Sequence, residues 1–341
     1  MKKRIQIMIC CAAALLCACS NEMDIEVLNS NPKMVLYCFP NTEHDTTIIN
    51  LSASVPVAKK TRNTSHEQVV VSNPRIIYRV NGEERMVSQA DENTDYVPKN
   101  SYYVVGANRS GDRISIEVSA EGYADIHAET VIPDMPDVAA FRNAIPVRRD
   151  DMNYDQYRIA LNSDPASDDY YAVSADFFCN EREVRYDELN DEWQEYTVYS
   201  RHGSAINVDD EPALNPISTL DDFFEYDNAF YNDFYIFNDN LFNGSQYTLR
   251  LNMSPLSYAW GRDIISYGYV FKIYKISQEY YRFIKSLNDV SNNWLGEYGL
   301  APLSPTLNNV AGGLGVVGGY SVAEHAYSYE PDYPNQSYLY E

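Results

Sequence analysis

The sequence predicts a mainly β protein, in which an N-terminal immunoglobulin-like β-sandwich precedes a second antiparallel β-rich domain with one amphipathic helix near the C-terminus. Three observations predict this fold. Apolar and polar residues alternate along many short segments, turn-forming residues separate those segments, and the chain holds 30 tyrosines, a residue suited to half-buried strands. The length of 341 residues and a hydrophobic content of 45% suffice for about two domains.

Residues 1–18 have the pattern of a secretory signal. A cationic start at residues 2–4 precedes an apolar run from Ile5 to Cys17, which is too short to span a bilayer. The run ends in Leu16-Cys17-Ala18-Cys19, which resembles the lipobox of bacterial lipoproteins. In such proteins the chain is cut before the cysteine and the sulfur is acylated, so we expect a lipid anchor at Cys19. A signal without lipidation is the alternative.

The first domain is predicted at residues 33–136, after a polar and acidic tether at residues 19–32. Its length is that of an immunoglobulin-like sandwich, and Pro133 and Pro136 close it. Alternating residues predict strands within 34–39, 49–57, 76–80, 114–120 and 126–132. The predicted turns are Asn81-Gly82, Ser110-Gly111-Asp112 and Glu121-Gly122, whose residues tolerate a positive φ.

The second domain is predicted at residues 154–319, after a connector at residues 137–153. Alternation predicts antiparallel strands within 157–161, 171–177, 247–253 and 269–273. After Ser277, a predicted N-cap, apolar residues recur at helical spacing and predict a helix over 278–294 packed on the sheet. Residues 320–341 are rich in Tyr and have no period, which predicts an exposed tail or an extension of a sheet edge.

Charge and spacing argue against nucleotide and nucleic-acid binding. The formal net charge is −23 and no Lys/Arg-rich run follows residue 4, so nucleic acid is a poor partner. Residues 313–318 spell G-x-G-x-x-G, but only 23 residues follow, which is too few for the βαβ unit that a dinucleotide site needs. The glycines therefore predict a turn where backbones approach closely, and we expect no cofactor.

No local motif proposes a catalytic or metal site. The five histidines lie far apart, and His127 is predicted on the solvent face of its strand. Acidic turns at 164–169 and 209–211 raise a calcium hypothesis, but chance clustering among 49 carboxylates is favoured. We therefore predict no catalytic residue, no metal and no enzymatic activity, with a hydrolase of scattered residues as a minor alternative. Cys38 and Cys179 are expected to be buried thiols, with a disulfide as the alternative.

An aromatic-rich stretch from Phe223 to Phe242 provides the candidate ligand-binding residues. Its rings interleave with Asp and Asn, and aromatic faces of this kind stack on sugars or peptide side chains. The alternative is that the rings fill the core beneath the second sheet. The candidates are Phe223, Phe224, Tyr226, Tyr231, Tyr235 and, outside the stretch, Trp260.

Read in order, several segments resemble a family of Bacteroidota surface lipoproteins catalogued as domain of unknown function 4249. They are Lys33-Met34-Val35-Leu36, residues 128–133, Asp164-Pro165-Ala166 with Asp169-Tyr170-Tyr171, residues 238–244 before Tyr247-Thr248-Leu249, residues 279–283 with 285–287, and residues 309–316. Val317 departs from the family pattern, which usually has an aromatic residue near the glycines. The Tyr-rich segment after Tyr320 is expected to lie beyond the resemblance.

The resemblance implies a lipid-anchored protein of the outer membrane that is accessory to a TonB-dependent transporter and captures or gates a nutrient. It carries over no catalytic residues. Glu22, Asp24 and Glu26 resemble the acidic surface-export signals of this phylum, so we expect the protein to face outward. A structural or adhesive surface protein is the alternative. The sequence leaves the ligand and the oligomeric state open.

Overall fold

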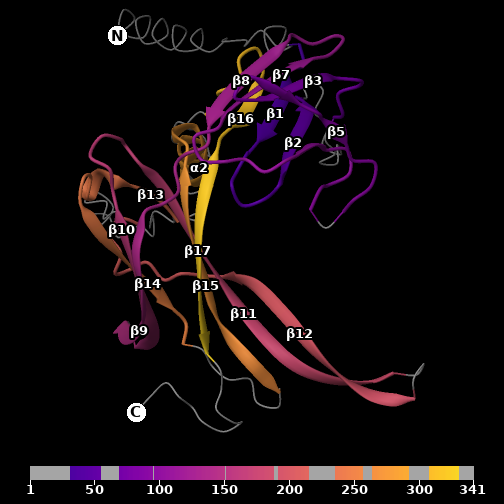
Figure 1. The fold of residues 1–341 in the computed structure, drawn as a ribbon. Helices are drawn as coiled ribbons and strands as arrows, with labels where there is room; N and C mark the ends of the chain where they lie inside the picture. Colours follow the sequence, from indigo (N-terminus) through magenta and orange to yellow (C-terminus); the bar gives the residue numbers. More distant parts are fainter. Residues whose placement is uncertain are drawn as a thin grey trace, which may run out of the picture.

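The computed structural model describes residues 31–54, 69–94, 96–149, 151–187, 191–214, 235–255, 263–291 and 307–329. These residues are mainly β, in several antiparallel sheets, with one α-helix near the C-terminus, which confirms the predicted fold class. The strands form two modules, which lie one above the other in Figure 1. Within the described ranges, no helix has the length and apolar character needed to cross a bilayer.

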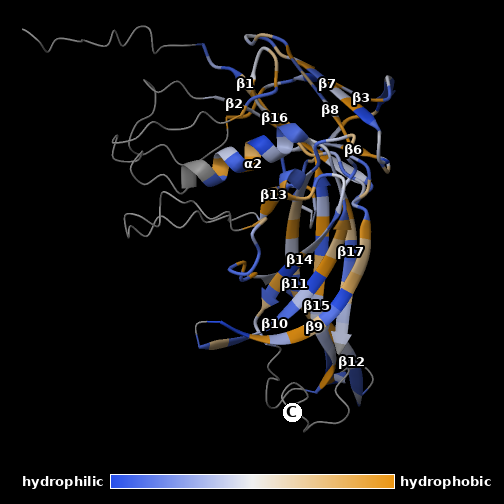
Figure 2. Ribbon diagram, turned by 90° about the vertical axis from the view of Figure 1, so that its left-hand side faces the viewer, coloured by the Kyte–Doolittle hydropathy of each residue, from blue (hydrophilic) through white to orange (hydrophobic). Residues whose placement is uncertain are grey.

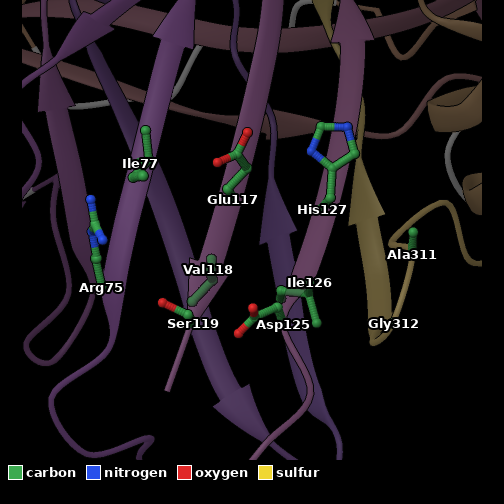
Figure 3. Close-up of a pocket in the computed structure, with 10 residues that line it drawn as sticks. All are labelled: Arg75, Ile77, Glu117, Val118, Ser119, Asp125, Ile126, His127, Ala311 and Gly312. Carbon is green, nitrogen blue, oxygen red and sulfur yellow. The ribbon is translucent and has the colours of Figure 1, made fainter. Parts of the chain in front are cut away.

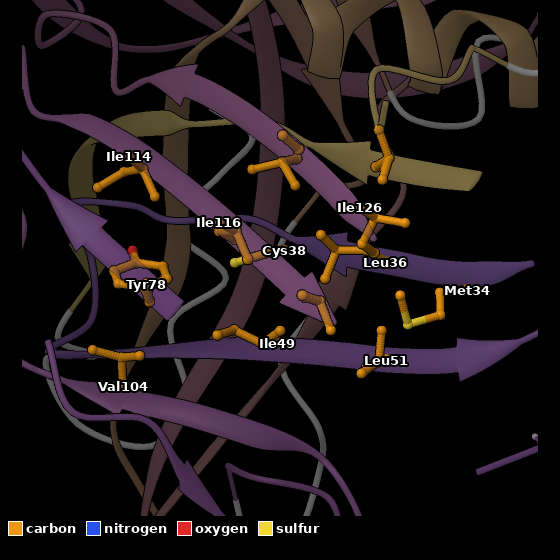
Figure 4. Packing of buried hydrophobic residues seen from close by; sticks show 14 of the residues in the cluster. Met34, Leu36, Cys38, Ile49, Leu51, Tyr78, Val104, Ile114, Ile116 and Ile126 are labelled. Atoms are coloured by element: carbon orange, nitrogen blue, oxygen red, sulfur yellow. The ribbon is translucent and has the colours of Figure 1, made fainter. Parts of the chain in front are cut away.

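The first module consists of two sheets that pack face to face. The five-stranded sheet has the order β16 (Leu314–Val317), β1 (Met34–Cys38), β2 (Thr46–Ala53), β6 (Tyr102–Val105), β5 (Ser88–Gln89). The four-stranded sheet has the order β4 (Glu83–Arg85), β3 (Arg75–Val80), β7 (Arg113–Ser119), β8 (Ile126–Val131). Alternate residues of both sheets meet in one core, in which Leu36, Ile49 and Ile116 are fully buried (Figure 4). The immunoglobulin-like detail stays a prediction.

The predicted turns of this module have the backbone geometry that their residues favour. Asn81 and Gly82 both adopt a positive φ, at 53° and 86°, as the tight hairpin between β3 and β4 requires. Gly111 and Gly122 also have positive φ values. The sequence therefore predicted the position and the chemistry of these turns correctly.

The glycine-rich segment forms a strand, β16, that returns to the first module. It pairs in parallel with β1, although the expected division placed all residues up to 319 in the second domain. At Gly315, where φ is +117°, a Cβ atom would lie 1.9 Å from the carbonyl oxygen of Leu36. Only glycine fits there, so the predicted close approach of backbones is present, in a strand and not in a turn.

The second module also has two sheets. One has the order β14 (Gln246–Met253), β10 (Met152–Asn162), β9 (Val138–Arg149). The other has the order β12 (Glu192–Ser204), β11 (Tyr170–Asp187), β15 (Ile264–Ile276), β17 (Tyr320–Tyr329), with β13 (Ile236–Asn238) beside β11 and the short 3-10 turn η2 (Asp239–Leu241) after it. Hydropathy alternates along these strands (Figure 2), and Tyr157, Tyr171 and Phe271 lie fully buried in the shared core.

Two segments of the second module differ from the expected division. Residues 138–149, predicted as a connector, form β9 and pair with β10, with register shifts between Gln156 and Arg158 and between Ala160 and Leu161. All twelve residues of this strand are exposed or half-buried, so its burial does not alternate. The sequence pattern therefore gave no indication of it. Residues 320–329, predicted as a tail or an edge extension, form the edge strand β17 against β15, which confirms the second possibility for that part.

Helix α2 (Gln278–Ser291) packs between the two modules. Ser277 is its N-cap as predicted, because the Ser277 hydroxyl accepts a hydrogen bond of 3.3 Å from the backbone N–H of Tyr280. Tyr280 stacks on Phe39 of the first module with ring centroids 4.5 Å apart, and Ile284 lies in a small core with Ile276 of the second sheet. The last residues of the predicted helix lie outside the described ranges.

The chain between β16 and β17 ties the modules together. The backbone N–H of Gly319 donates to the Thr130 hydroxyl at 3.0 Å, and the Ser277 N–H donates to the Gly319 carbonyl at 2.9 Å. The hydroxyl of Ser321, which is fully buried, donates to the Asp134 carbonyl at 2.6 Å. Because these bonds connect both modules to one continuous segment, the second sheet has a fixed orientation relative to the first module.

Candidate functional site

Most of the residues predicted to function lie outside the described ranges. These are Cys19, Phe223, Phe224, Tyr226, Tyr231 and Trp260, and their roles stay predictions. Tyr235 is described, and its ring packs against the second core while its hydroxyl accepts a 3.0 Å hydrogen bond from the Ile206 N–H. Phe237 and Phe242 are buried in the same core, so the core-filling alternative is correct for these two rings.

Cys38 and Cys179 are both buried, and neither forms a disulfide. Each lies in the interior of a different module, so the favoured interpretation as small buried thiols is confirmed and the disulfide alternative is wrong. Burial raises the pKa of the Cys38 thiol far above its ordinary value. Such a thiol has no nucleophilic role at neutral pH.

Carboxylates of the acidic turns make hydrogen bonds and ion pairs within the second module. The buried carboxylate of Asp239 accepts from the Ser163 hydroxyl at 2.6 Å and from the Asp169 N–H at 3.2 Å, and Lys275 Nζ lies 2.8 Å from Asp169 Oδ2. Glu211 is fully buried and accepts hydrogen bonds from the Tyr247 hydroxyl and from two backbone N–H groups. Among the described residues, no three His, Cys, Asp or Glu side chains converge to hold a metal ion.

A shallow groove of about 530 Å³ lies on the solvent face of the four-stranded sheet (Figure 3). The register places Ile77, Glu117 and His127 in one row across β3, β7 and β8, and the segment at 311–312 borders β8. Glu117 Oε1 lies 2.7 Å from Arg79 Nη1, and this hydrogen bond lowers the pKa of Glu117.

Two of the charged groups at this groove already have partners, Glu117 with Arg79 and His127 with Glu129. His127 is exposed as predicted, and its Nε2 lies 3.3 Å from Glu129 Oε1. The Glu117–Arg79 pair joins two neighbouring strands and the His127–Glu129 pair lies within β8, while Arg75 and Asp125 also line the groove. Exposed pairs of this kind, with the half-buried Ile77 beside them, offer little affinity to a ligand. The arrangement is that of a solvated sheet face.

A charged network lies where the first module meets the second sheet. Lys272 Nζ contacts Glu43 of the first module and lies 3.6 Å from Glu324 Oε2, while Arg201 pairs with Asp176 at 2.8 Å and with Glu324 at 3.4 Å. Burial lowers the pKa of Lys272, but the hydrogen bond to Glu43 and the nearby charges outweigh it, so the pKa is raised. Within this network, the contact between Lys272 and Glu43 joins the two modules.

The hairpin formed by β11 and β12 extends beyond the rest of its sheet (Figure 1). The pairing of β15 with β11 ends at Glu181, whereas the pairing of β12 with β11 continues to Asp187. We call residues 183–187 and 191–196 the arm. In the register of the described strands, each strand of the arm pairs only with the other.

The arm exposes large apolar side chains. Trp193 is 70% exposed, and Tyr186, directly opposite it, is 45% exposed, with the two ring centroids 5.3 Å apart. Val184 lies on the same face and is 55% exposed. On the other face, the Arg185 guanidinium lies 5.8 Å above the ring of Tyr196. The arm is the part of the described chain that most resembles an interaction surface.

Sequence reasoning missed the arm. Its available signal is a run in which charged residues alternate with aromatic and β-branched ones, as in Glu183-Val184-Arg185-Tyr186 and Glu192-Trp193-Gln194-Glu195-Tyr196. These residues favour a β-strand, but neither face of that strand is apolar enough to pack in a core. The pattern would have indicated a solvent-exposed hairpin.

Comparison with models of known protein families identifies a match to this chain. The family described as Domain of unknown function (DUF4249) matches residues 20–326. The match includes the first residues of the segment that was expected to lie beyond the resemblance. The search among curated proteins finds no match.

Proposed function

The chain belongs to the DUF4249 family, and we propose that it is a lipid-anchored outer-membrane protein that serves, without catalysis, as an accessory to a TonB-dependent nutrient transporter. In this role it captures a substrate or docks on the transporter. Cys19 carries the anchor, and the protein faces outward.

The N-terminal pattern supports the anchor. Residues 1–18 have the charge and length of a secretory signal, and the family match starts at residue 20, next to Cys19. Several acyl chains on one residue hold a protein at a membrane without a spanning segment, because each buried methylene contributes about 0.8 kcal/mol. The acidic residues Glu22, Asp24 and Glu26 give this segment the charged composition of a tether.

The observation that carries the proposal is the exposed arm on a fixed support. A sheet that ends in exposed aromatic side chains suits binding, since Trp and Tyr are enriched among the few residues that contribute most of the binding energy at protein interfaces. The arm and the first module, where β1 begins, lie at opposite ends of the molecule (Figure 1). A protein anchored through the tether before β1 would thus present the arm away from its anchor.

Co-purification tests this function. The full chain, tagged and expressed from its own promoter, is extracted in mild detergent and the accompanying proteins are identified. We expect a TonB-dependent transporter, and we expect Cys19→Ala to release the protein from the membrane fraction. Absence of any transporter under native expression would contradict the proposal.

Growth and attachment separate this role from the structural or adhesive alternative. Loss of an accessory to uptake slows growth on one defined nutrient and leaves attachment to surfaces unchanged. Loss of an adhesive protein leaves growth on every defined nutrient unchanged and alters attachment. The large negative charge, which keeps surfaces apart, is the feature that favours the alternative.

A further inference from the structure

We propose that the arm is a docking surface for a partner protein whose matching surface combines apolar and basic side chains. The inference deepens the proposed function and rests on it in taking interaction as the role of the chain. It adds which residues make the contact and what chemistry the partner presents.

Among the described residues, no element covers the exposed rings of the arm. Phe178, on the same face of β11 but closer to the body of the sheet, is only 7% exposed, because it lies over Gly268 of β15 and stacks on Tyr199. Beyond Glu181 the register with β15 has ended, and Trp193 is 70% exposed. A large aromatic residue exposed to this degree, beside Tyr186 and Val184, forms an apolar patch that folding has not covered.

Contacts within the arm account for only part of this exposed apolar patch. The contact between Tyr186 and Trp193 is a cross-strand aromatic pair, which contributes roughly 0.2–1 kcal/mol. The Tyr186 hydroxyl also donates to Asp191. These contacts hold the two strands together, yet most of the Trp193 side chain remains in water.

The arm is also negatively charged. The arm carries five carboxylates and a single guanidinium, an excess of four negative charges. The five are Glu183, Asp187, Asp191, Glu192 and Glu195. The guanidinium, of Arg185, is already held by Glu183, with Nε and Oε2 2.8 Å apart, and Arg182, directly before the arm, has its Nε 3.9 Å from Glu195 Oε2. Asp191 and Glu192 directly precede Trp193, so the exposed ring lies within a negative field.

This charge selects among the possible occupants. Segments that insert aromatic rings at a membrane surface pair them with Lys and Arg, and acidic residues oppose approach to anionic lipid. A second copy of the chain would bring the same excess of negative charge against itself. A protein surface with Lys or Arg around an apolar pocket satisfies both the rings and the carboxylates, and the basic groups also gain contacts with aromatic faces.

Site-specific photo-crosslinking tests the proposal. Benzoylphenylalanine replaces Trp193 in the full chain, expressed in its native envelope, and replaces Met86 in a matched control, since Met86 is 83% exposed but lies in the first module. We expect light to give one discrete protein adduct from position 193 and none from position 86. Sequencing of the linked peptide should show Lys or Arg beside apolar residues.

Charge reversal completes the test. Asp191→Lys with Glu192→Lys, added to the crosslinking chain, should lower the adduct yield at least tenfold, and higher salt should lower it as well. An unchanged unfolding midpoint shows that the chain is intact. The proposal is wrong if no adduct forms, if light links position 193 to lipid or to a second copy, or if the adduct survives charge reversal.

The outcomes also separate this inference from the proposed function. An adduct with a protein other than a transporter, sensitive to charge reversal, supports the docking surface and counts against the accessory role. Co-purification of a transporter that persists after charge reversal, without an adduct at position 193, supports the accessory role and overturns the docking surface.

Discussion

Residues 175–180 of β11 are paired with β12 on one edge and β15 on the other, whereas residues 183–187 of the same strand are paired with β12 alone. In the first segment Ala175, Phe178 and Cys179 are buried. In the second segment Val184 and Tyr186 are exposed. The backbone register runs through both without a shift.

Burial along this hairpin follows the pairing with β15, because the strand conformation is the same in both parts. A two-stranded ribbon is marginally stable in water, so the arm depends on the sheet that supports it. Apolar residues in the supported part therefore contribute to stability, and those in the arm are available for binding. Four predictions test this division.

The largest effect is expected for Phe271→Ala. Phe271 of β15 pairs with Ala175, is fully buried, and contacts the rings of Tyr157 and Tyr327. Truncation of a buried Phe leaves a cavity and costs about 3–5 kcal/mol. Val184→Ala in the arm should change the free energy of unfolding by less than about 0.5 kcal/mol. Denaturant titration of both variants measures the difference, and equal losses would refute the division.

A smaller effect is expected for Gly268→Ala, in the supported part of the sheet, where Gly268 pairs with Phe178. A Cβ atom there would lie 1.7 Å from the carbonyl oxygen of Tyr327 and 3.1 Å from the Phe178 ring. Relief of this clash requires β15 and β17 to separate, at a cost of about 1–3 kcal/mol.

Gly203→Ala is the matched control, because the nearest atom to its Cβ is Asp176 Oδ1 at 3.9 Å. We expect this variant to be neutral or slightly stabilising, since alanine loses less backbone entropy than glycine on folding. Thermal unfolding compares the two variants. A midpoint for Gly268→Ala equal to that of Gly203→Ala would show that the two strands separate without cost.

The sequence was a good guide wherever local pattern and burial coincide. The alternation at residues 114–118 predicted β7, the Asn81-Gly82 pair predicted a hairpin turn, and Ser277 with the apolar spacing after it predicted α2. In each case the residues that set the local structure are close together in the chain. Their preferences agree with the tertiary environment.

The sequence was a poor guide wherever distant segments decide the structure. The parallel pairing of β16 with β1 joins residues almost 280 positions apart. The glycine run indicates a close backbone approach, but it does not indicate which segment of the chain approaches. The strand β9 and the arm have little or no buried face, so the sequence pattern there does not indicate a strand that faces a core. Of the six ligand-binding candidates only Tyr235 is described, and it is held against the core.

A third prediction concerns the support between the modules. Lys272→Met leaves the carboxylate of Glu43 without its main partner and should cost about 1–3 kcal/mol at neutral pH, as for partly buried ion pairs. Lys99→Met, at an exposed site, should cost less than about 0.5 kcal/mol.

The pH dependence follows from the direction of the shift. The pKa of Lys272 in the folded state is raised above 10.5, so its contribution is present in full below that pH and is lost as the pH rises through the folded-state pKa. The difference in unfolding free energy between wild type and Lys272→Met should therefore shrink in strongly alkaline solution. A constant difference across that range would show that the charge of Lys272 is not responsible.

The smallest effect on stability is expected for Trp193→Ala. The side chain is 70% exposed and its main contact is one ring, so its loss should cost less than about 1 kcal/mol, the value of a cross-strand aromatic pair. A double-mutant cycle with Tyr186→Ala isolates that pair and should give a coupling of about 0.5–1 kcal/mol. If Trp193→Ala instead destabilised the chain as much as Phe271→Ala does, the ring would be part of the folded core. The arm would then have no surplus apolar surface to offer a partner.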